Sequence, residues 1–300
     1  GLPGGGILLS TGSNLDQGGN MKLLVGESVG KGGSLLMTAG DSSTQTGGNV
    51  HLSSGASAVM TSGQITVESG NSKQATGNSG SIGIYTGASS TGSSGSVALQ
   101  SGTAMLSSGD VTIGASNGGS GGNVVLAAGN SVTETGGSIL MQSGGSDTGS
   151  GGSAQFITGT SAQSSGSLVM RTGNAATENS GAIQLMSGSV LAEGTVGNID
   201  MIGGNSQTGN GGSINIRAGT SNSQQGGSVL IKSGAGSTSS GDILAFSADS
   251  NGKSGSISMK SGSSTDSASG NIEFISGDSV LSTGSVSLGA GSSSTGVGAS

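Results

Sequence analysis

The side chains best suited to acid–base or metal chemistry are few in this sequence and lie far apart. His51 is the single histidine, and the 300 residues contain no cysteine. A nucleophilic triad or an imidazole metal site needs partner residues, and none can be nominated for His51. Its place between Val50 and Leu52 favours a solvated side chain on an extended segment. The sequence therefore predicts no catalytic residue, no metal ligand and no enzyme.

Two other patterns suggest ligand binding at first sight, and their spacing argues against it. Gly-x-Gly strings recur along the whole chain, but no Gly-Lys-Ser/Thr motif of a phosphate loop accompanies them. Calcium-binding glycine-rich repeats need an aspartate in every turn, whereas Asp110, Asp200 and Asp242 stand isolated. We therefore expect no cofactor and no calcium array, with incidental weak cation binding as the alternative.

One set of cations has regular spacing. Arg171, Arg217 and Lys260 occupy the same place in repeats that lie three units apart. If these repeats stack, like charges come close together and must face water or an anionic partner. We interpret the three residues as a candidate polyanion ladder for an acidic extracellular polysaccharide. The alternative is a solvated charged face that salt screens.

Composition excludes several classes of protein. The chain has 66 glycines, one proline, no tryptophan and 8% charged residues, with a net charge of −7. It has no collagen period, no basic footprint for nucleic acid and no apolar run of membrane-spanning length. The scarcity of aromatic residues disfavours recognition of small molecules or peptides. Glycine and serine in such amounts are also typical of disorder, which is the alternative to any fold.

A short unit repeats along nearly the whole sequence. It reads [Gly/Ser]-Gly-[Ser/Asn/Asp]-φ-x-φ-x-[Ser/Thr/Ala]-Gly, where φ is Val, Ile, Leu, Met or Phe; 136–144 and 226–234 are examples. The spacing is 13 to 17 residues, and the units begin at 18, 32, 47, 62, 79, 94, 108, 121, 136, 151, 165, 180, 196, 211, 226, 240, 254, 269 and 283. A fixed period predicts a repeat architecture, here a single array over 1–300.

The unit predicts short strands. Its φ-x-φ alternation is a strand signal, and the flanking glycines suit corners that need positive φ or close backbone approach. A short strand cannot bury a face alone, but stacked parallel strands can. We therefore predict an all-β fold, a parallel β-solenoid (β-helix), with almost no helix.

Loop composition recurs every three units. Apolar loops contain Val59-Met60, Met105-Leu106, Val190-Leu191 and Val280-Leu281, which lie three or six units apart. This favours coils of three units, in which Leu52, Leu99 and Met141 would stack as neighbours. The alternative is one unit per coil.

The repeat resembles the Gly/Ser-rich tandem repeats of large secreted proteins from diatoms and related algae. The segments 136–146 and 226–237 carry the resemblance most clearly. It implies extracellular or cell-surface material that is adhesive or filament-forming, and it carries over no catalytic residue.

The first functional hypothesis is a structural extracellular protein that self-associates into a filament, sheath or adhesive. Its outermost segments still follow the repeat, so we expect end-to-end stacking or membership of a longer array. The first alternative is ice binding by flat polar ladders, suggested by Thr44-x-Thr46 and Thr133-x-Thr135. A polysaccharide-binding module is the second. A glycan-acting enzyme would need clustered carboxylates, which the sequence lacks.

Overall fold

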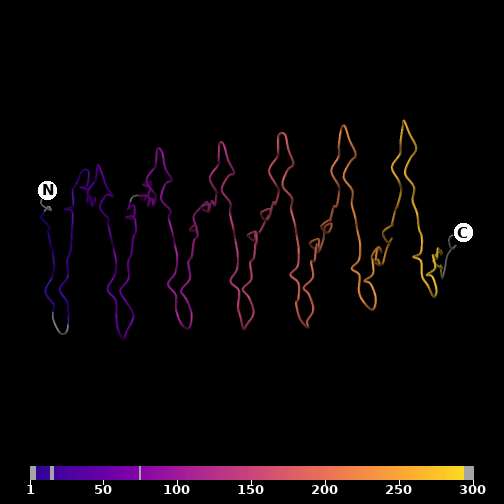
Figure 1. The fold of residues 1–300 in the computed structure, drawn as a ribbon, viewed down its shortest axis with the longest axis horizontal. Helices are drawn as coiled ribbons and strands as arrows, with labels where there is room; N and C mark the ends of the chain where they lie inside the picture. The colour runs from indigo at the N-terminus through magenta and orange to yellow at the C-terminus, as the bar shows by residue number, and fades with distance from the viewer. Residues whose placement is uncertain (1–4, 14–16, 74–75, 294–300) are drawn as a thin grey trace. The chain divides into compact units, whose positions relative to one another are not determined.

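The structure is a computed structural model that describes residues 5–13, 17–73 and 76–293. Across these three ranges it contains no helix and no strand. The chain instead runs outward and back repeatedly in open excursions (Figure 1). The prediction of almost no helix is confirmed. The prediction of an all-β fold is wrong for the described residues.

The β-solenoid (β-helix) is therefore a misassignment, and so is its division into three-unit or one-unit coils. Without strands there is no stack to bring Leu52, Leu99 and Met141 together as ladder neighbours. The physical reason lies in the composition of the unit. About three large apolar side chains serve roughly fifteen residues, many of them glycine, which loses the most conformational freedom on ordering. Burial of so few side chains does not fix the whole backbone.

The turning points of the chain follow the repeat closely. Bends lie at 43–45, 58–60, 132–134, 147–149, 207–209 and 222–224, each between the end of one unit and the start of the next. We call these connecting segments loops. We call the segment from the unit's Ser, Asn or Asp to the small residue before its final glycine a limb, as in 138–143. The sequence therefore predicted the positions of limbs and loops correctly.

The limbs retain the alternation that suggested strands. In limb 138–143, Ile139 is 50% exposed, Leu140 83% and Met141 64%. Successive side chains of an extended backbone point to opposite sides, so the two outer residues share one side and Leu140 takes the other. The period-two signal thus describes the local direction of side chains. It does not establish pairing between neighbouring backbones.

The chain divides into two units, Gly1–Ala154 and Gln155–Ser300. The division falls inside the repeat that begins at 151, and the same limb and loop pattern occurs on both sides of it. A single tandem array over 1–300 stays a prediction from the sequence.

Very little of the surface is covered. The accessible surface of this 27.9 kDa chain is 30310 Å². A folded monomer of that mass exposes roughly 11,000 Å², and its extended chain roughly 40,000 Å². No described residue is buried, whether apolar or polar. The isolated chain is consequently an open coil with local order and no hydrophobic core.

Candidate interaction surface

The recurrent structural device of the chain is a backbone hydrogen bond at the base of a loop. The N–H of Gly48 donates to the carbonyl oxygen of Gly40 at 2.8 Å, and Gly137 donates to Gly129 at 2.9 Å. The same bond occurs at Gly63–Gly55, Gly152–Gly144, Gly212–Gly204, Gly227–Gly219 and Gly241–Gly234. We call it the glycine clasp. It joins the last glycine of one unit to the glycine at the second position of the next.

Glycine is required at the clasp because two chain segments approach closely there. A Cβ added to Gly137 would lie 3.3 Å from the Ala128 Cβ and 3.3 Å from the Gly129 nitrogen. At Gly48 the corresponding distances to the Ala39 Cβ and the Gly40 nitrogen are 3.2 Å. The predicted close backbone approach is confirmed at these positions. Positive φ is not: among the described residues it occurs at Gly194 alone, with φ of 152°.

Serine side chains close the loops from within. The Ser131 Oγ accepts a hydrogen bond from the Glu134 N–H at 2.8 Å, three residues along. Serine competes well for nearby backbone donors, which is why it favours turns. The other serines with a bond to the third residue along are Ser42, Ser57, Ser89, Ser146, Ser206, Ser221, Ser264 and Ser279. In each of these nine loops a serine Oγ accepts a hydrogen bond from the backbone N–H three residues along, and we call this bond the serine cap. The tip of each of these loops is exposed.

Sequence reasoning missed this cap, although the signal was present. The serine stands two residues after the last glycine of its unit, as in Gly40-x-Ser42 and Gly129-x-Ser131. The repeat continues as Gly-x-[Ser/Ala] at this place, but no role in the turn was predicted for the serine. The structure shows that the Gly-x-Ser spacing sets the turn.

The most sheltered side chains are the small residues at the loop bases. Half-buried residues in the described ranges all occupy the place directly before the unit's final glycine: Ala39, Ser69, Ser101, Ala128, Ser143, Thr158, Thr172, Gly203, Ser233, Ser261 and Ser276. The facing glycine of the clasp covers them where the clasp forms. These small side chains are thus partly covered by the loop base, and the described residues form no apolar core that could cover them.

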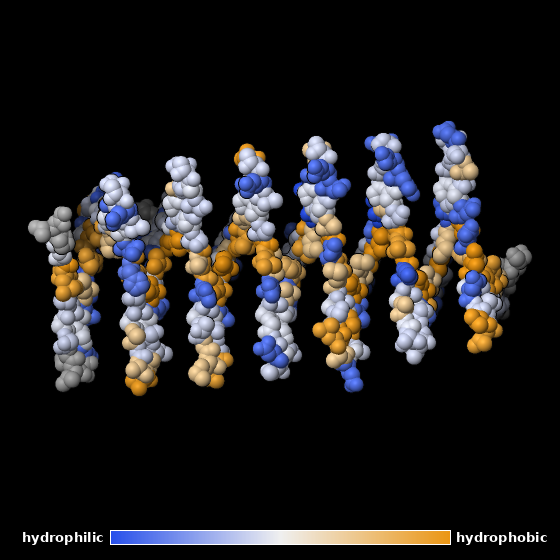
Figure 2. All heavy atoms as spheres, in the orientation of Figure 1, coloured by the Kyte–Doolittle hydropathy of each residue, from blue (hydrophilic) through white to orange (hydrophobic). Residues whose placement is uncertain are grey.

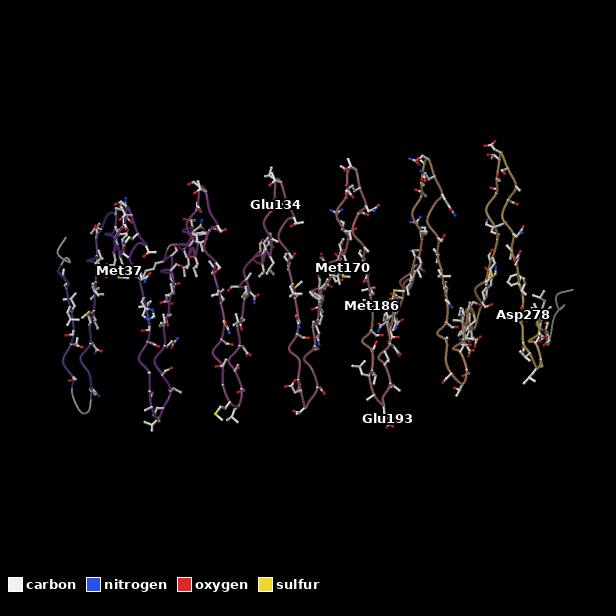
Figure 3. All side chains as sticks on the ribbon, in the orientation of Figure 1. Met37, Glu134, Met170, Met186, Glu193 and Asp278 are labelled. Carbon is white, nitrogen blue, oxygen red and sulfur yellow. The ribbon has the colours of Figure 1, made fainter. Side chains whose placement is uncertain are left out.

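The large apolar side chains of the limbs face solvent. Figure 2 shows apolar surface along the excursions of the chain, with polar surface at some of their ends and apolar surface at others. Met37 and Met170 lie on limbs, whereas Glu134 and Glu193 lie in loops (Figure 3). Met37 is 70% exposed and Met170 58%. Such residues recur from repeat to repeat, so the described limbs each present exposed apolar side chains. These limbs are the candidate interaction surface.

The polyanion-ladder residues are exposed but are not brought into contact. Arg171, Arg217 and Lys260 each stand directly before the small residue at the end of a limb, and Lys232 holds the same place. No hydrogen bond or ion pair joins these four cations to another described residue. The polyanion ladder stays a prediction from the sequence.

The remaining candidates stay as the sequence placed them. His51 is exposed. Within 5–13, 17–73 and 76–293, no group of three or more His, Asp or Glu side chains gathers in a way that could hold a metal ion. Over the same ranges, no helix has the length and hydropathy that a membrane crossing requires.

Comparison with known proteins adds no relative. No protein-family model, curated protein or solved structure matches the chain. The resemblance to algal Gly/Ser-rich repeats therefore stays a prediction from the motif. Function has to be inferred from the exposed limbs and the loop bases.

Proposed function

We propose that this chain is a structural, self-associating repeat polypeptide of extracellular or cell-surface material, which contributes to a filament, sheath or adhesive. The observation that carries the proposal is the complete exposure of its repeated apolar residues. Burial of apolar area stabilises association by about 25 cal/mol per Å². The chain leaves 30310 Å² of total surface exposed, and the apolar part of that surface is available for burial against other molecules.

Low charge supports the same function. Charged residues make up 8% of the sequence, and the net charge of −7 is spread over 300 residues. Repulsion between copies is therefore weak, and physiological salt screens it within about 8 Å. The glycine clasps hold the loop bases closed at regular intervals and leave the apolar side chains of the limbs exposed. Identical limbs at regular spacing favour a partner with the same spacing, and another copy of the chain has it.

The extracellular location rests on composition. The sequence has no cysteine, few lysines and a high content of serine, threonine and glycine, which is more usual in extracellular material than in cytosolic enzymes. The ice-binding alternative depended on flat ladders of stacked strands. The described residues contain no strand, so that alternative gains no support from the fold.

Concentration-dependent assembly tests the proposed function. Light scattering and sedimentation velocity of the purified chain should show a growing fraction of large species as concentration rises. Reduction of the apolar character of several limbs, by Ile139→Ser, Ile183→Ser and Ile231→Ser together, should move the onset to higher concentration. The matched control is Thr148→Ser, Thr177→Ser and Thr220→Ser in the loops. A chain that stays monomeric at all accessible concentrations and salt conditions would falsify the proposal.

A further inference from the structure

The charges on the limbs are sorted by position. Counting from the Ser, Asn or Asp that begins a limb, the cations Arg171, Arg217, Lys232 and Lys260 all hold the fifth position. The acids Asp110 and Asp242 hold the first position, and Asp200 and Glu273 hold the third. There are two exceptions: Glu68 is an acid at the fifth position, and Lys22 is a cation at the third. Because acids and bases tend to hold different positions, some side-by-side alignments of two limbs bring opposite charges together and others bring like charges together.

The clasp shows which positions face each other. At the base of loop 234–241 the Gly241 N–H donates to the Gly234 carbonyl at 3.0 Å. A Cβ on Gly241 would lie 3.8 Å from the Ser233 Cβ, so these two residues face each other. If this alignment is continued one residue further from the loop on each limb, Asp242 comes opposite Lys232. The next step brings Ile243 opposite Ile231.

This antiparallel alignment satisfies both charge and hydropathy. The first position of one limb meets the fifth position of the other, so the acid Asp242 meets the base Lys232. The second position meets the fourth, so apolar residues meet apolar residues. Directly opposed residues of antiparallel segments come within about 5.5 Å, where opposite charges stabilise and like charges destabilise. Parallel, in-register alignment would instead place Arg171, Arg217 and Lys260 against one another.

Within a single chain this alignment stops at the clasp. The Gly241–Gly234 bond is the only backbone–backbone bond between these two limbs, and Lys232 and Asp242 make no ion pair. Ile231 is 70% exposed and Ile243 58%. The complementary side chains are thus present, exposed and unpaired.

We propose that a second copy of this chain docks antiparallel on limbs 228–233 and 242–247, with Lys232 of each copy opposite Asp242 of the other. The inference rests on the proposed self-association and specifies its register. The arrangement is two-fold symmetric, because one contact is repeated with the roles of the copies exchanged. One pair of limbs is small, and the array strengthens the contact because the other limbs present apolar residues at the second position and mostly at the fourth.

The test exploits that symmetry in the full-length chain at low ionic strength. Asp242→Lys and Lys232→Asp each replace two attractive contacts per dimer by two repulsive ones. Each variant alone should lose about tenfold in association constant, measured by sedimentation equilibrium. An equimolar mixture of the two variants should recover the wild-type constant, because each mixed pair restores both contacts. Asp200→Lys is the matched control, since it changes net charge as Asp242→Lys does but holds the third position.

The other outcomes separate this proposal from the proposed function. If the mixture fails to recover association while the double variant recovers it, the two residues pair within one chain and the docking proposal is overturned. If Asp242→Lys behaves as Asp200→Lys does, the register is wrong although self-association stands. If the wild-type chain does not associate, both proposals fall.

Discussion

The glycine clasp makes a sharp prediction at Gly137. Replacement by alanine places a methyl group 3.3 Å from the Ala128 Cβ, 3.3 Å from the Gly129 nitrogen and 3.5 Å from its oxygen. Ordinary contacts between carbon atoms begin near 3.5 Å, so the two segments must separate by a few tenths of an ångström. The Gly137–Gly129 hydrogen bond of 2.9 Å lies at the same spot and must lengthen.

The size of the effect follows from the exposure of that bond. Hydrogen bonds contribute about 0.5–1.5 kcal/mol net, because water competes for both partners. We expect Gly137→Ala to cost about 1 kcal/mol of loop closure, a factor of about five in the ratio of closed to open loop. Gly129→Ala is the matched control. It changes the acceptor residue of the same clasp, and nothing lies within 4 Å of its added Cβ.

Amide exchange measured by nuclear magnetic resonance reads the closed fraction of this loop. In the Gly137→Ala variant the amide at 137 should exchange faster than in the control, by about the factor of five. The amides at 48 and 152, which belong to other clasps, serve as internal references and should not change. Equal exchange at 137 in the two variants would refute the close-approach explanation for this glycine.

Three further predictions concern the loops and the open coil. Ser131→Ala removes the acceptor of the 2.8 Å bond from the Glu134 N–H, so the Glu134 amide should exchange a few times faster, whereas Thr133→Ala in the same loop should leave it unchanged. Gly194→Ala forces an L-residue to φ of 152°, with the Val190 Cγ1 3.3 Å from the new Cβ. The variant should lose about 1 kcal/mol of local stability and change the chemical shifts of loop 188–197. Unchanged shifts would contradict the assignment of φ. Small-angle scattering of the dilute monomer should give a radius of gyration well above the roughly 19 Å of a folded domain of 300 residues, and a value near 19 Å would disprove the open coil.

The local part of the structure could be predicted from the sequence. Ile139, Leu140 and Met141 alternate in exposure as their spacing predicts, and the bends fall between units. Gly48 and Gly137 lie at close backbone contacts, as expected of corner glycines. These features depend on steric and hydrogen-bonding rules that act within about ten residues. A repeat motif reports such rules directly.

The long-range part of the structure could not be predicted from the sequence. Periodicity does not show whether the free energy gained by burying side chains exceeds the conformational entropy lost when the backbone is ordered. The recurrence of loops such as Met105-Leu106 was interpreted as stacking, yet those two residues are fully exposed. The Arg171, Arg217 and Lys260 series was likewise interpreted as a ladder. Repetition of a unit guarantees equal spacing along the chain only. Neighbours in space require a favourable contact energy, which about three large apolar residues per unit do not supply.

Mechanical behaviour follows from the clasp. A single weak bond closes the eight Cα–Cα steps from Gly40 to Gly48, or from Gly129 to Gly137. When tension opens it, those residues can extend to about 27 Å, at some 3.4 Å per residue. The limbs and any contacts between copies are untouched, and the bond re-forms when the load falls. A thread of such repeats would stretch in many small reversible steps and dissipate energy at each one, which single-molecule pulling can record as a series of short, low-force extensions.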